Sequence, residues 1–323
     1  MKAVVQDRYG SADVLEVREV DVPAPAPDQV LVRVKAAGVN MADWHVMSGE
    51  PTVARLFLGF DGPKAKTRGS DVAGVVEAVG TDVTEFAVGD EVFGSASGSF
   101  AELALSRAKR LVRKPANVSF EHAAAAPMAG YTALQALRAA GLAAAGDGDG
   151  KHVLVVGAAG GVGSFTVQLA KHFGARVTGV CSTAKVELVR SLGADEVIDY
   201  KTDAVTGQFD VIVETAGGRT ISESRALLTR EGVLVIVGGE GGGRVFGLAG
   251  RTMSAPLRSM FVSQRLVGLM ALESAEDLAV LAELLSAGSI TPAIDTVYAL
   301  DKAPDAIRHL EEGRAAGKVV VVP

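Results

Sequence analysis

Residues 153–185, VLVVGAAGGVGSFTVQLAKHFGARVTGVCSTAK, decide the fold of this chain. A run of four apolar residues (153–156) ends in a glycine-rich turn, a helical pattern occupies 164–173, and a second Val-rich strand follows at 176–180. This order of strand, turn, helix and strand is typical of a dinucleotide-binding unit, in which the glycines let backbone N–H groups approach a pyrophosphate at a helix N-terminus. An ordinary structural turn between strand and helix is the alternative interpretation.

The end of the second strand indicates which dinucleotide is bound. A site for NAD usually places Asp or Glu there to bond the ribose 2′-hydroxyl. In this chain the strand ends in Cys181, and Ser182, Thr183 and Lys185 follow. Two hydroxyls and an ammonium suit a 2′-phosphate, so we predict NADPH as the cofactor. The alternative is that Ser182 or Thr183 only caps the next helix.

The bulk composition predicts a two-domain protein that binds neither nucleic acid nor membrane. The 323 residues are 48% hydrophobic with a mean hydropathy of +0.28, enough for two buried cores. A formal charge of −6 without a long basic run argues against nucleic-acid binding. The single cysteine, Cys181, excludes an intrachain disulfide and a multi-cysteine zinc site. The charged N-terminus and the lack of about 20 consecutive apolar residues lead us to expect a cytoplasmic protein.

The pattern along the chain divides it into a β-rich part and an α/β part. Residues 1–110 contain strand candidates at 1–6, 14–20, 29–37, 71–79 and 90–94, typical of a small barrel-like domain, and 120–140 predicts a helix. From residue 151 strands and helices alternate, which predicts a parallel sheet with helices on both faces. We expect a flexible connection at 141–150 and a glycine-dense ligand loop at 238–250. The predicted domains are 1–120, 121–270, and a return to the first domain at 271–323.

Seven motifs, in this order, resemble a known family over nearly the whole chain. They are GVNMADWHVMSGEP (38–51), GSDVAGVVEAVG (69–80), VGDEVFG (88–94), AAAAPMAGYTALQAL (123–137), GAAGGVG (157–163), SLGADEVIDY (191–200) and GKVVVV (317–322). The family is the zinc-free medium-chain dehydrogenases/reductases of the quinone oxidoreductase (zeta-crystallin-like) type. The resemblance implies a doubly wound Rossmann sheet with a GroES-like β-rich catalytic domain. It also implies a homodimeric, NADPH-dependent enzyme that reduces quinones or α,β-unsaturated carbonyls (enones).

Two departures from the zinc alcohol dehydrogenases of this family exclude a metal at the reaction centre. Those relatives have a cysteine where this chain has Asn40, and a GHE segment where it has Gly69, Ser70 and Asp71. Without thiolate or imidazole ligands a stable tetrahedral zinc site cannot form, so we predict no bound metal. The glycine fingerprint also departs slightly, since its first glycine is Ala158, preceded by Gly157.

The segment 40–45 supplies the catalytic candidates. Related enone reductases often carry lysine where this chain has His45, so His45 is our hypothesis for the group that stabilises the enolate or delivers its proton. Asn40 could donate to the substrate carbonyl, and Trp44 and Tyr131 could line the substrate pocket. The alternatives are a surface histidine, a turn-forming asparagine and two packing aromatics. We expect Asp43 to fix this loop.

The remaining site predictions concern the cofactor. The resemblance places Thr132 near the nicotinamide, Phe261 and Val262 at its carboxamide, and Lys318 towards the substrate side, although apolar core is the alternative for 261 and 262. Tyr200 resembles a residue beside the 2′-phosphate, with a surface tyrosine as the alternative. The predicted cofactor residues are Thr132, Ala159, Gly160, Gly161, Val162, Gly163, Ser182, Thr183, Lys185, Tyr200, Thr215, Gly238, Phe261, Val262 and Lys318.

Two other functions fit the same residues. An enoyl-thioester reductase would need a basic entrance for the phosphates of its carrier, and Arg55, Lys64, Lys66 and Arg68 supply some positive charge. A non-catalytic NADPH-binding protein on this fold is also possible, because the chain has no clear acid–base pair.

Overall fold

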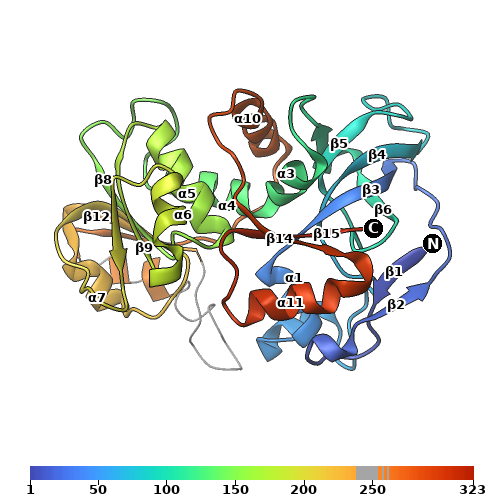
Figure 1. The fold of residues 1–323 in the computed structure, drawn as a ribbon, viewed down its shortest axis with the longest axis horizontal. Helices are drawn as coiled ribbons and strands as arrows, with labels where there is room; N and C mark the ends of the chain where they lie inside the picture. Colours follow the sequence, from blue (N-terminus) through green and yellow to red (C-terminus); the bar gives the residue numbers. More distant parts are fainter. Residues whose placement is uncertain (238–253, 257, 260–261) are drawn as a thin grey trace. The chain divides into compact units, whose positions relative to one another are not determined.

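The computed structural model of the chain describes every residue except 238–253, 257 and 260–261 (Figure 1). The chain forms two compact units: unit 1 is Met1–Tyr131 with Glu273–Pro323, and unit 2 is Thr132–Leu272. Residues 121–131 therefore lie in unit 1, whereas the predicted boundary assigned them to the nucleotide-binding domain. Residues 271 and 272 lie in unit 2 instead of in the predicted return segment.

Unit 1 is built on β-sheet, as the alternating apolar pattern predicts. A two-stranded antiparallel sheet consists of β1 (Lys2–Val5) and β2 (Glu16–Glu19). The main sheet has the order β14 (Ile294–Ala299), β15 (Lys318–Val322), β3 (Gln29–Val39), β4 (Asp71–Val79), β5 (Glu91–Ser95) and β7 (Leu111–Arg113), with β6 (Leu103–Arg107) also paired to β3.

The helices of unit 1 are short, and the C-terminal segment returns to this unit as predicted from the pattern. The α-helices are α1 (Met41–Ser48), α2 (Arg55–Leu58), α3 (Phe120–Ala125), α10 (Ala275–Ser286) and α11 (Ala303–Glu311). The 3₁₀ turns are η1 (Ala12–Val14), η2 (Thr52–Ala54), η3 (Ala108–Arg110) and η5 (Leu300–Lys302). The helix predicted over 120–140 is two helices, α3 and α4 (Pro127–Ala139). Pro127 lacks an N–H to continue α3 and suits the first turn of the next helix.

Strand register in unit 1 brings three distant polar residues to one place. In the antiparallel pair of β15 and β3, Val319 lies opposite Val39, so Lys318 is next to Asn40. In the pair of β3 and β4, Ala36 lies opposite Ala73, so Asp71 is next to Gly38. A Cβ on Gly38 would lie 2.4 Å from the Ala124 carbonyl oxygen, so only glycine permits α3 to pack this closely on β3.

Unit 2 is a six-stranded parallel sheet with the order β10 (Glu196–Asp199), β9 (Arg176–Cys181), β8 (His152–Val156), β11 (Phe209–Glu214), β12 (Leu228–Ile236) and β13 (Arg265–Gly268). Numbered from β8 this is the 3-2-1-4-5-6 order of dinucleotide-binding sheets. Helices α5 (Gly161–His172) and α6 (Val186–Ser191) lie on one side and α7 (Ile221–Ala226) on the other (Figure 1), with the 3₁₀ turn η4 (Thr183–Lys185) before α6. The predicted fold class is confirmed.

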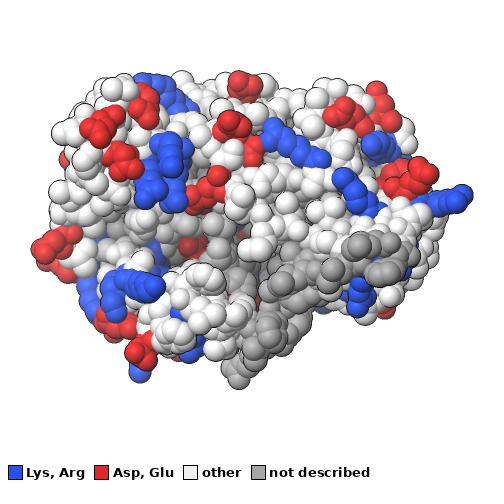
Figure 2. Space-filling view, turned by 180° about the vertical axis from the view of Figure 1, so that it is seen from behind, with Lys and Arg blue, Asp and Glu red and all other residues white. Residues whose placement is uncertain are grey.

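The length and apolarity of the helices, in the part of the chain that the structure describes, bear on the possibility of a membrane span. No helix there is both long and apolar enough to cross a bilayer. Acidic and basic side chains are interspersed on the face shown in Figure 2.

Candidate functional site

The glycine turn of unit 2 lies at the carboxyl end of the central strand β8, where ligands bind in such sheets. The predicted residues Ala159 to Gly163 run from this turn into the first turn of α5, whose leading N–H groups have no partner within the helix. Gly160 occupies the N-cap position, and it, Gly161 and Val162 are partly exposed. The structure thus brings these five residues together as a backbone cradle of the kind that binds a pyrophosphate.

Two glycines of this turn are required by the space around them. Gly157 has a φ of +83°, and a Cβ there would lie 2.6 Å from Thr215 Oγ1. A Cβ on Gly163 would lie 2.0 Å from the Gly157 carbonyl oxygen. Gly157 therefore makes the tight turn, while Ala158, which stands at the first fingerprint position, is fully buried against Gly179 of β9.

The predicted 2′-phosphate residues gather where β9 and β10 end side by side, because Asp199 pairs with Cys181 in that register. Ser182 and Lys185 are partly exposed there, and Tyr200 is 57% exposed with its N–H donating to the Cys181 carbonyl oxygen at 3.1 Å. Sequence reasoning missed Asp199. Its carboxylate accepts hydrogen bonds from the Thr183 hydroxyl and from the Lys201 N–H, and these bonds lower its pKa.

Asp199 changes the expected charge at this corner. We predicted a site without a carboxylate, but the neighbouring strand brings one to Thr183. The Thr183 hydroxyl already donates a hydrogen bond to the Asp199 carboxylate. Ser182 and Lys185 are therefore better candidates than Thr183 for binding the 2′-phosphate.

The other predicted cofactor residues have mixed outcomes. Thr215 follows β11, and its hydroxyl donates to the Val156 carbonyl oxygen at 2.8 Å, beside the glycine turn. Thr132 is nearly buried in α4, and Val262 packs against the apolar core of unit 2, as the core alternative proposed. Gly238, Phe261 and the loop 238–250 lie outside the described residues.

In unit 1 the carboxamide of Asn40 is bonded on both sides by the protein. Its Nδ2 donates to Asp71 Oδ2 at 2.9 Å, and its Oδ1 accepts from Lys318 Nζ at 2.5 Å. The side chain is almost buried. This geometry fits a structural asparagine better than the carbonyl-binding role that we predicted.

Lys318 and Asp71 form the charged centre of this cluster. Lys318 is 2% exposed, and its ammonium also donates to the Val39 carbonyl oxygen at 3.0 Å and lies 3.9 Å from Asp71 Oδ2. Asp71 is fully buried and accepts from the Met128 N–H at the start of α4. Burial raises the pKa of Asp71 to about 6, although Lys318 opposes the rise. Lys318 was predicted to reach the cofactor, but its buried ammonium lies among these unit 1 oxygens.

Asp43 and Ser70 extend the cluster. Asp43 Oδ2 accepts from the Asn40 N–H at 2.8 Å, which is the loop-fixing bond that we expected, and Oδ1 lies 3.3 Å from Ser70 Oγ. Burial raises the pKa of Asp43 to about 7, with Asp71 adding to the rise. The result is two carboxyl groups and one ammonium in a space that water barely reaches.

The aromatic candidates and His45 lie on and near α1. His45 is exposed, its Nδ1 is 2.8 Å from the Glu50 carbonyl oxygen, and its ring meets Trp44 edge-on at 4.9 Å. The Nδ1 contact leaves Nε2 as the nitrogen that could meet a ligand. Trp44 packs against the core of unit 1, and Tyr131 is 3% exposed, with burial raising its pKa. Tyr131 is thus buried and Trp44 only partly buried, and their contact with a substrate stays a prediction.

The residues that correspond to zinc ligands do not suit a zinc ion. Asn40 Oδ1 and Asp71 Oδ2, two oxygens that could ligate a cation, both face the Lys318 ammonium. A divalent ion placed among them would be repelled by the Lys318 ammonium, whose pKa is lowered by burial while Asp71 and Asp43 oppose that shift. Among the described residues no group of three or more His, Cys, Asp or Glu side chains could hold a metal ion.

The four residues considered for the basic entrance of an enoyl-thioester reductase differ in exposure, and Lys64 and Lys66 are exposed. Arg68 is 3% exposed, Arg55 donates to the Gly49 carbonyl oxygen and stacks on Tyr9, and Lys66 is 3.6 Å from an Asp7 carboxylate oxygen. A carrier phosphate needs accessible cations, and of these residues Lys64 and Lys66 meet that requirement.

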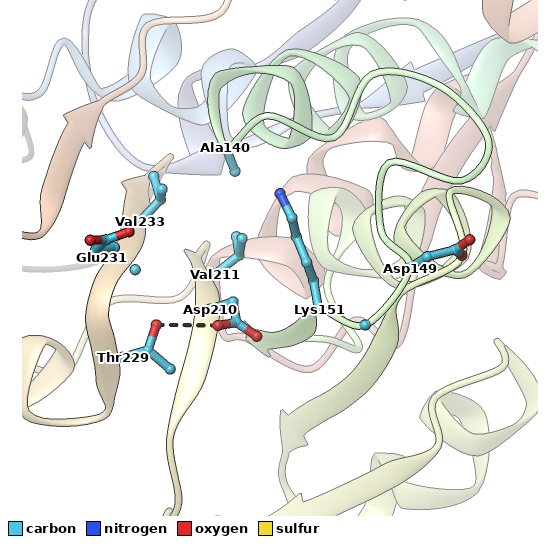
Figure 3. Close-up of a pocket in the computed structure, with 10 residues that line it drawn as sticks. Ala140, Asp149, Lys151, Asp210, Val211, Thr229, Glu231 and Val233 are labelled. Carbon is cyan, nitrogen blue, oxygen red and sulfur yellow. Dashed lines mark hydrogen bonds between the residues drawn. The ribbon is translucent and has the colours of Figure 1, made fainter.

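A cavity of about 250 Å³ lies near the amino ends of β8, β11 and β12, at the other end of these strands from the glycine turn (Figure 3). Two of its polar lining residues, Asp210 and Thr229, are hydrogen-bonded within the protein. Asp210 accepts from the Thr229 hydroxyl at 3.2 Å and from the His152 N–H at 2.9 Å. Because ligands of such sheets bind beyond the carboxyl ends of the strands, this cavity is not the nucleotide site.

Comparison with known proteins connects both units to one group of enzymes. Residues 26–116 match the family described as alcohol dehydrogenase GroES-like domain, and residues 192–321 match the family described as zinc-binding dehydrogenase.

Individual relatives match along the whole chain. The chloroplast envelope quinone oxidoreductase homolog of Arabidopsis thaliana is 36% identical, over 100% of this chain and 98% of the relative. The NADPH-dependent alkenal/one oxidoreductase of the same plant is 35% identical, over 100% of this chain and 80% of the relative. The solved quinone oxidoreductase of Coxiella burnetii superposes with a TM-score of 0.86 at 28% identity, covering 100% of this chain and 99% of that one.

Proposed function

Because the chain belongs to the medium-chain dehydrogenase/reductase family, in its quinone oxidoreductase branch, we propose that it is an enzyme that transfers hydride from NADPH to quinones or enones. The observation that carries the proposal is the backbone cradle of residues 159–163 at the N-terminus of α5, at the end of β8. Relatives named for quinone and alkenal/one reduction supply the substrate class.

NADPH would bring the reducing power, since its nicotinamide is a strong hydride donor. The chain's task is then to hold the cofactor and to stabilise charge on the substrate oxygen. The cradle would bind the pyrophosphate, and Ser182 and Lys185 would bind the 2′-phosphate. Lys201 opposes the charge of Asp199, which would otherwise repel that phosphate.

We further propose that the enzyme works without zinc. The Lys318 ammonium lies among the oxygens of Asn40 and Asp71. This supports the proposal, because a positive charge stands where a bound metal would need negatively charged ligands. His45, through Nε2, is retained as a candidate for stabilising the reduced substrate. A homodimer acting in the cytoplasm remains our expectation, which size-exclusion chromatography and localisation of the tagged protein would test.

The decisive assay follows NADPH oxidation with quinones, short enones, enoyl-CoA thioesters and saturated ketones. We expect turnover with quinones or enones, and little with saturated ketones, because a saturated ketone cannot delocalise the developing charge. Preference for enoyl-CoA would favour the thioester reductase. Tight NADPH binding without turnover on any of these would favour the non-catalytic protein and refute the proposal.

A further inference from the structure

We propose that Asp43 and Ser70 form a proton-delivering pair, in which the Ser70 hydroxyl gives its proton to the reduced substrate and Asp43 replaces it. The inference rests on the proposed reduction of enones and names the group that completes it.

The pair connects a buried acid to a more accessible hydroxyl. Asp43 is 6% exposed, whereas Ser70 is only half-buried, and Ser70 Oγ lies 3.3 Å from Asp43 Oδ1. Ser70 comes immediately before β4, and Asp43 lies in the first turn of α1. A hydroxyl suits this intermediate position, because it can accept one proton while donating another.

The hydrogen bonds of Asp43 decide which of its oxygens can carry a proton. Oδ2 accepts the Asn40 N–H at 2.8 Å, so a proton on that oxygen would lose a bond. Oδ1 faces the Ser70 hydroxyl, which can reverse and accept. A protonated Asp43 therefore presents its O–H to Ser70.

Asp71, the other acid of the cluster, does not suit this role. It is fully buried, and its oxygens face three donors: the Asn40 amide, the Met128 N–H and the Lys318 ammonium. These donors favour its ionised form, and no hydroxyl links it outward among its recorded bonds. Asp71 instead keeps a negative charge near Asp43.

The charges around Asp43 explain why it can hold a proton near neutral pH. Burial is the largest cause of its raised pKa of about 7, Asp71 adds to the rise, and Lys318 and the Ser70 hydrogen bond oppose it. Arg68 and Tyr131 also face it: Asp43 favours the charged guanidinium and disfavours the phenolate. Below pH 7 most Asp43 carries the proton, and above it most has lost the proton.

The proposed step balances for an enone. The hydride from NADPH forms a C–H bond at the β-carbon, and the π electrons shift to give an enolate. The Ser70 O–H bond breaks as its proton passes to the enolate, while the Asp43 Oδ1–H proton moves to Ser70 Oγ. After the product leaves, Ser70 Oγ accepts a proton from solvent and passes its own proton back to Asp43 Oδ1. The sum is NADPH, one proton and enone going to NADP⁺ and the saturated carbonyl.

The test is a kcat–pH profile of the full-length protein with one enone and one quinone. Wild type should lose enone kcat above about pH 7, approaching tenfold per pH unit. Ser70→Ala and Asp43→Asn should lower enone kcat roughly a hundredfold and remove that dependence, the range for loss of a general acid. Ser70→Thr keeps the hydroxyl and should restore most of the rate. Asp13→Asn, which removes an exposed carboxylate of unit 1, is the matched control.

The outcomes separate this inference from the proposed function. The proposed pair would be overturned if Ser70→Ala and Ser70→Thr both kept the kcat and the pH profile of the wild type. It would also be overturned if His45→Ala lost enone turnover while Ser70→Ala lost none. A wild-type melting curve of unit 1, followed by Trp44 fluorescence, shows that each variant is folded, so a variant that fails to fold cannot imitate the expected result. If wild type reduces neither substrate, the proposed function fails first.

Discussion

Replacing Lys318 by methionine tests whether a buried ammonium holds the polar cluster of unit 1 together. Lys318→Met keeps the volume and removes the charge. It leaves the Asn40 Oδ1 and Val39 carbonyl oxygens without their donor, and Asp71 without the cation that lies 3.9 Å away. Because Lys318 is 2% exposed and Asp71 fully buried, water cannot compensate.

Breaking a buried ion pair by removing one partner costs about 3–5 kcal/mol. At about 2–4 °C per kcal/mol for a unit of this size, the melting temperature of unit 1 should fall by roughly 10 °C at pH 8. Without Lys318 the pKa of Asp71 rises further above its value of about 6. In the variant the folded state keeps Asp71 protonated at a pH at which the unfolded chain has released that proton. The stability that this proton contributes is present at low pH and is lost as pH rises through the raised pKa of Asp71. The deficit should therefore shrink at pH 5.

Trp44 makes the assay specific. It is the only tryptophan, and it packs against the core of unit 1, so its fluorescence reports the melting of that unit alone. Adding Asp71→Asn to Lys318→Met should recover several degrees at pH 8, because the uncompensated charge is gone. An equal melting temperature for wild type and Lys318→Met at pH 8, or a deficit that does not change between pH 5 and 8, would refute the reasoning.

Three further predictions concern the cofactor and the metal. Lys185→Ala should raise the NADPH dissociation constant roughly tenfold and leave that of NADH unchanged. Asp199→Asn should lower the NADPH dissociation constant by roughly two- to fivefold. Fluorescence titration checks both predictions, and equal effects on the two nucleotides would contradict them. Gly163→Ala should abolish NADPH binding and lower stability, because its Cβ would lie 2.0 Å from the Gly157 carbonyl oxygen. Gly160→Ala should fold normally and only weaken NADPH binding, because its Cβ would lie 3.3 Å from the same oxygen. Elemental analysis should find less than stoichiometric zinc, and chelators should leave NADPH oxidation unchanged; one zinc per chain with chelator-sensitive activity would overturn this.

The Rossmann unit could be predicted because its signal is local. Strand, turn and helix follow one another within about thirty residues, and the space at Gly163 is limited by Gly157 and Ala158 of the same segment. The split of 120–140 into two helices was also available, since Pro127 cannot continue a helix. Asp199 was missed because it is brought to Thr183 by the pairing of β10 with β9, which the sequence pattern alone does not show.

The cluster of unit 1 could not be predicted as a unit. Asn40, Asp43, Asp71 and Lys318 come from α1 or its N-cap and from two separate strands, and only the register of β15, β3 and β4 joins them. Read one at a time, Lys318 suggested a cofactor contact and Asn40 a substrate contact. In the structure their side chains bond to each other inside unit 1, and a contact of either with cofactor or substrate stays a prediction.

The enclosure of Lys318 has a consequence for the chemistry that unit 1 can support. A zinc ion with an open coordination position can bind a substrate oxygen directly and polarise a saturated carbonyl. The Lys318 ammonium is buried and bonded to Asn40 and Val39, so it has no comparable open position. Such a site depends on substrates that delocalise the charge developing during hydride transfer over their own conjugated system. These substrates then need only a proton to complete the reduction. Quinones and enones meet that requirement, and saturated ketones do not.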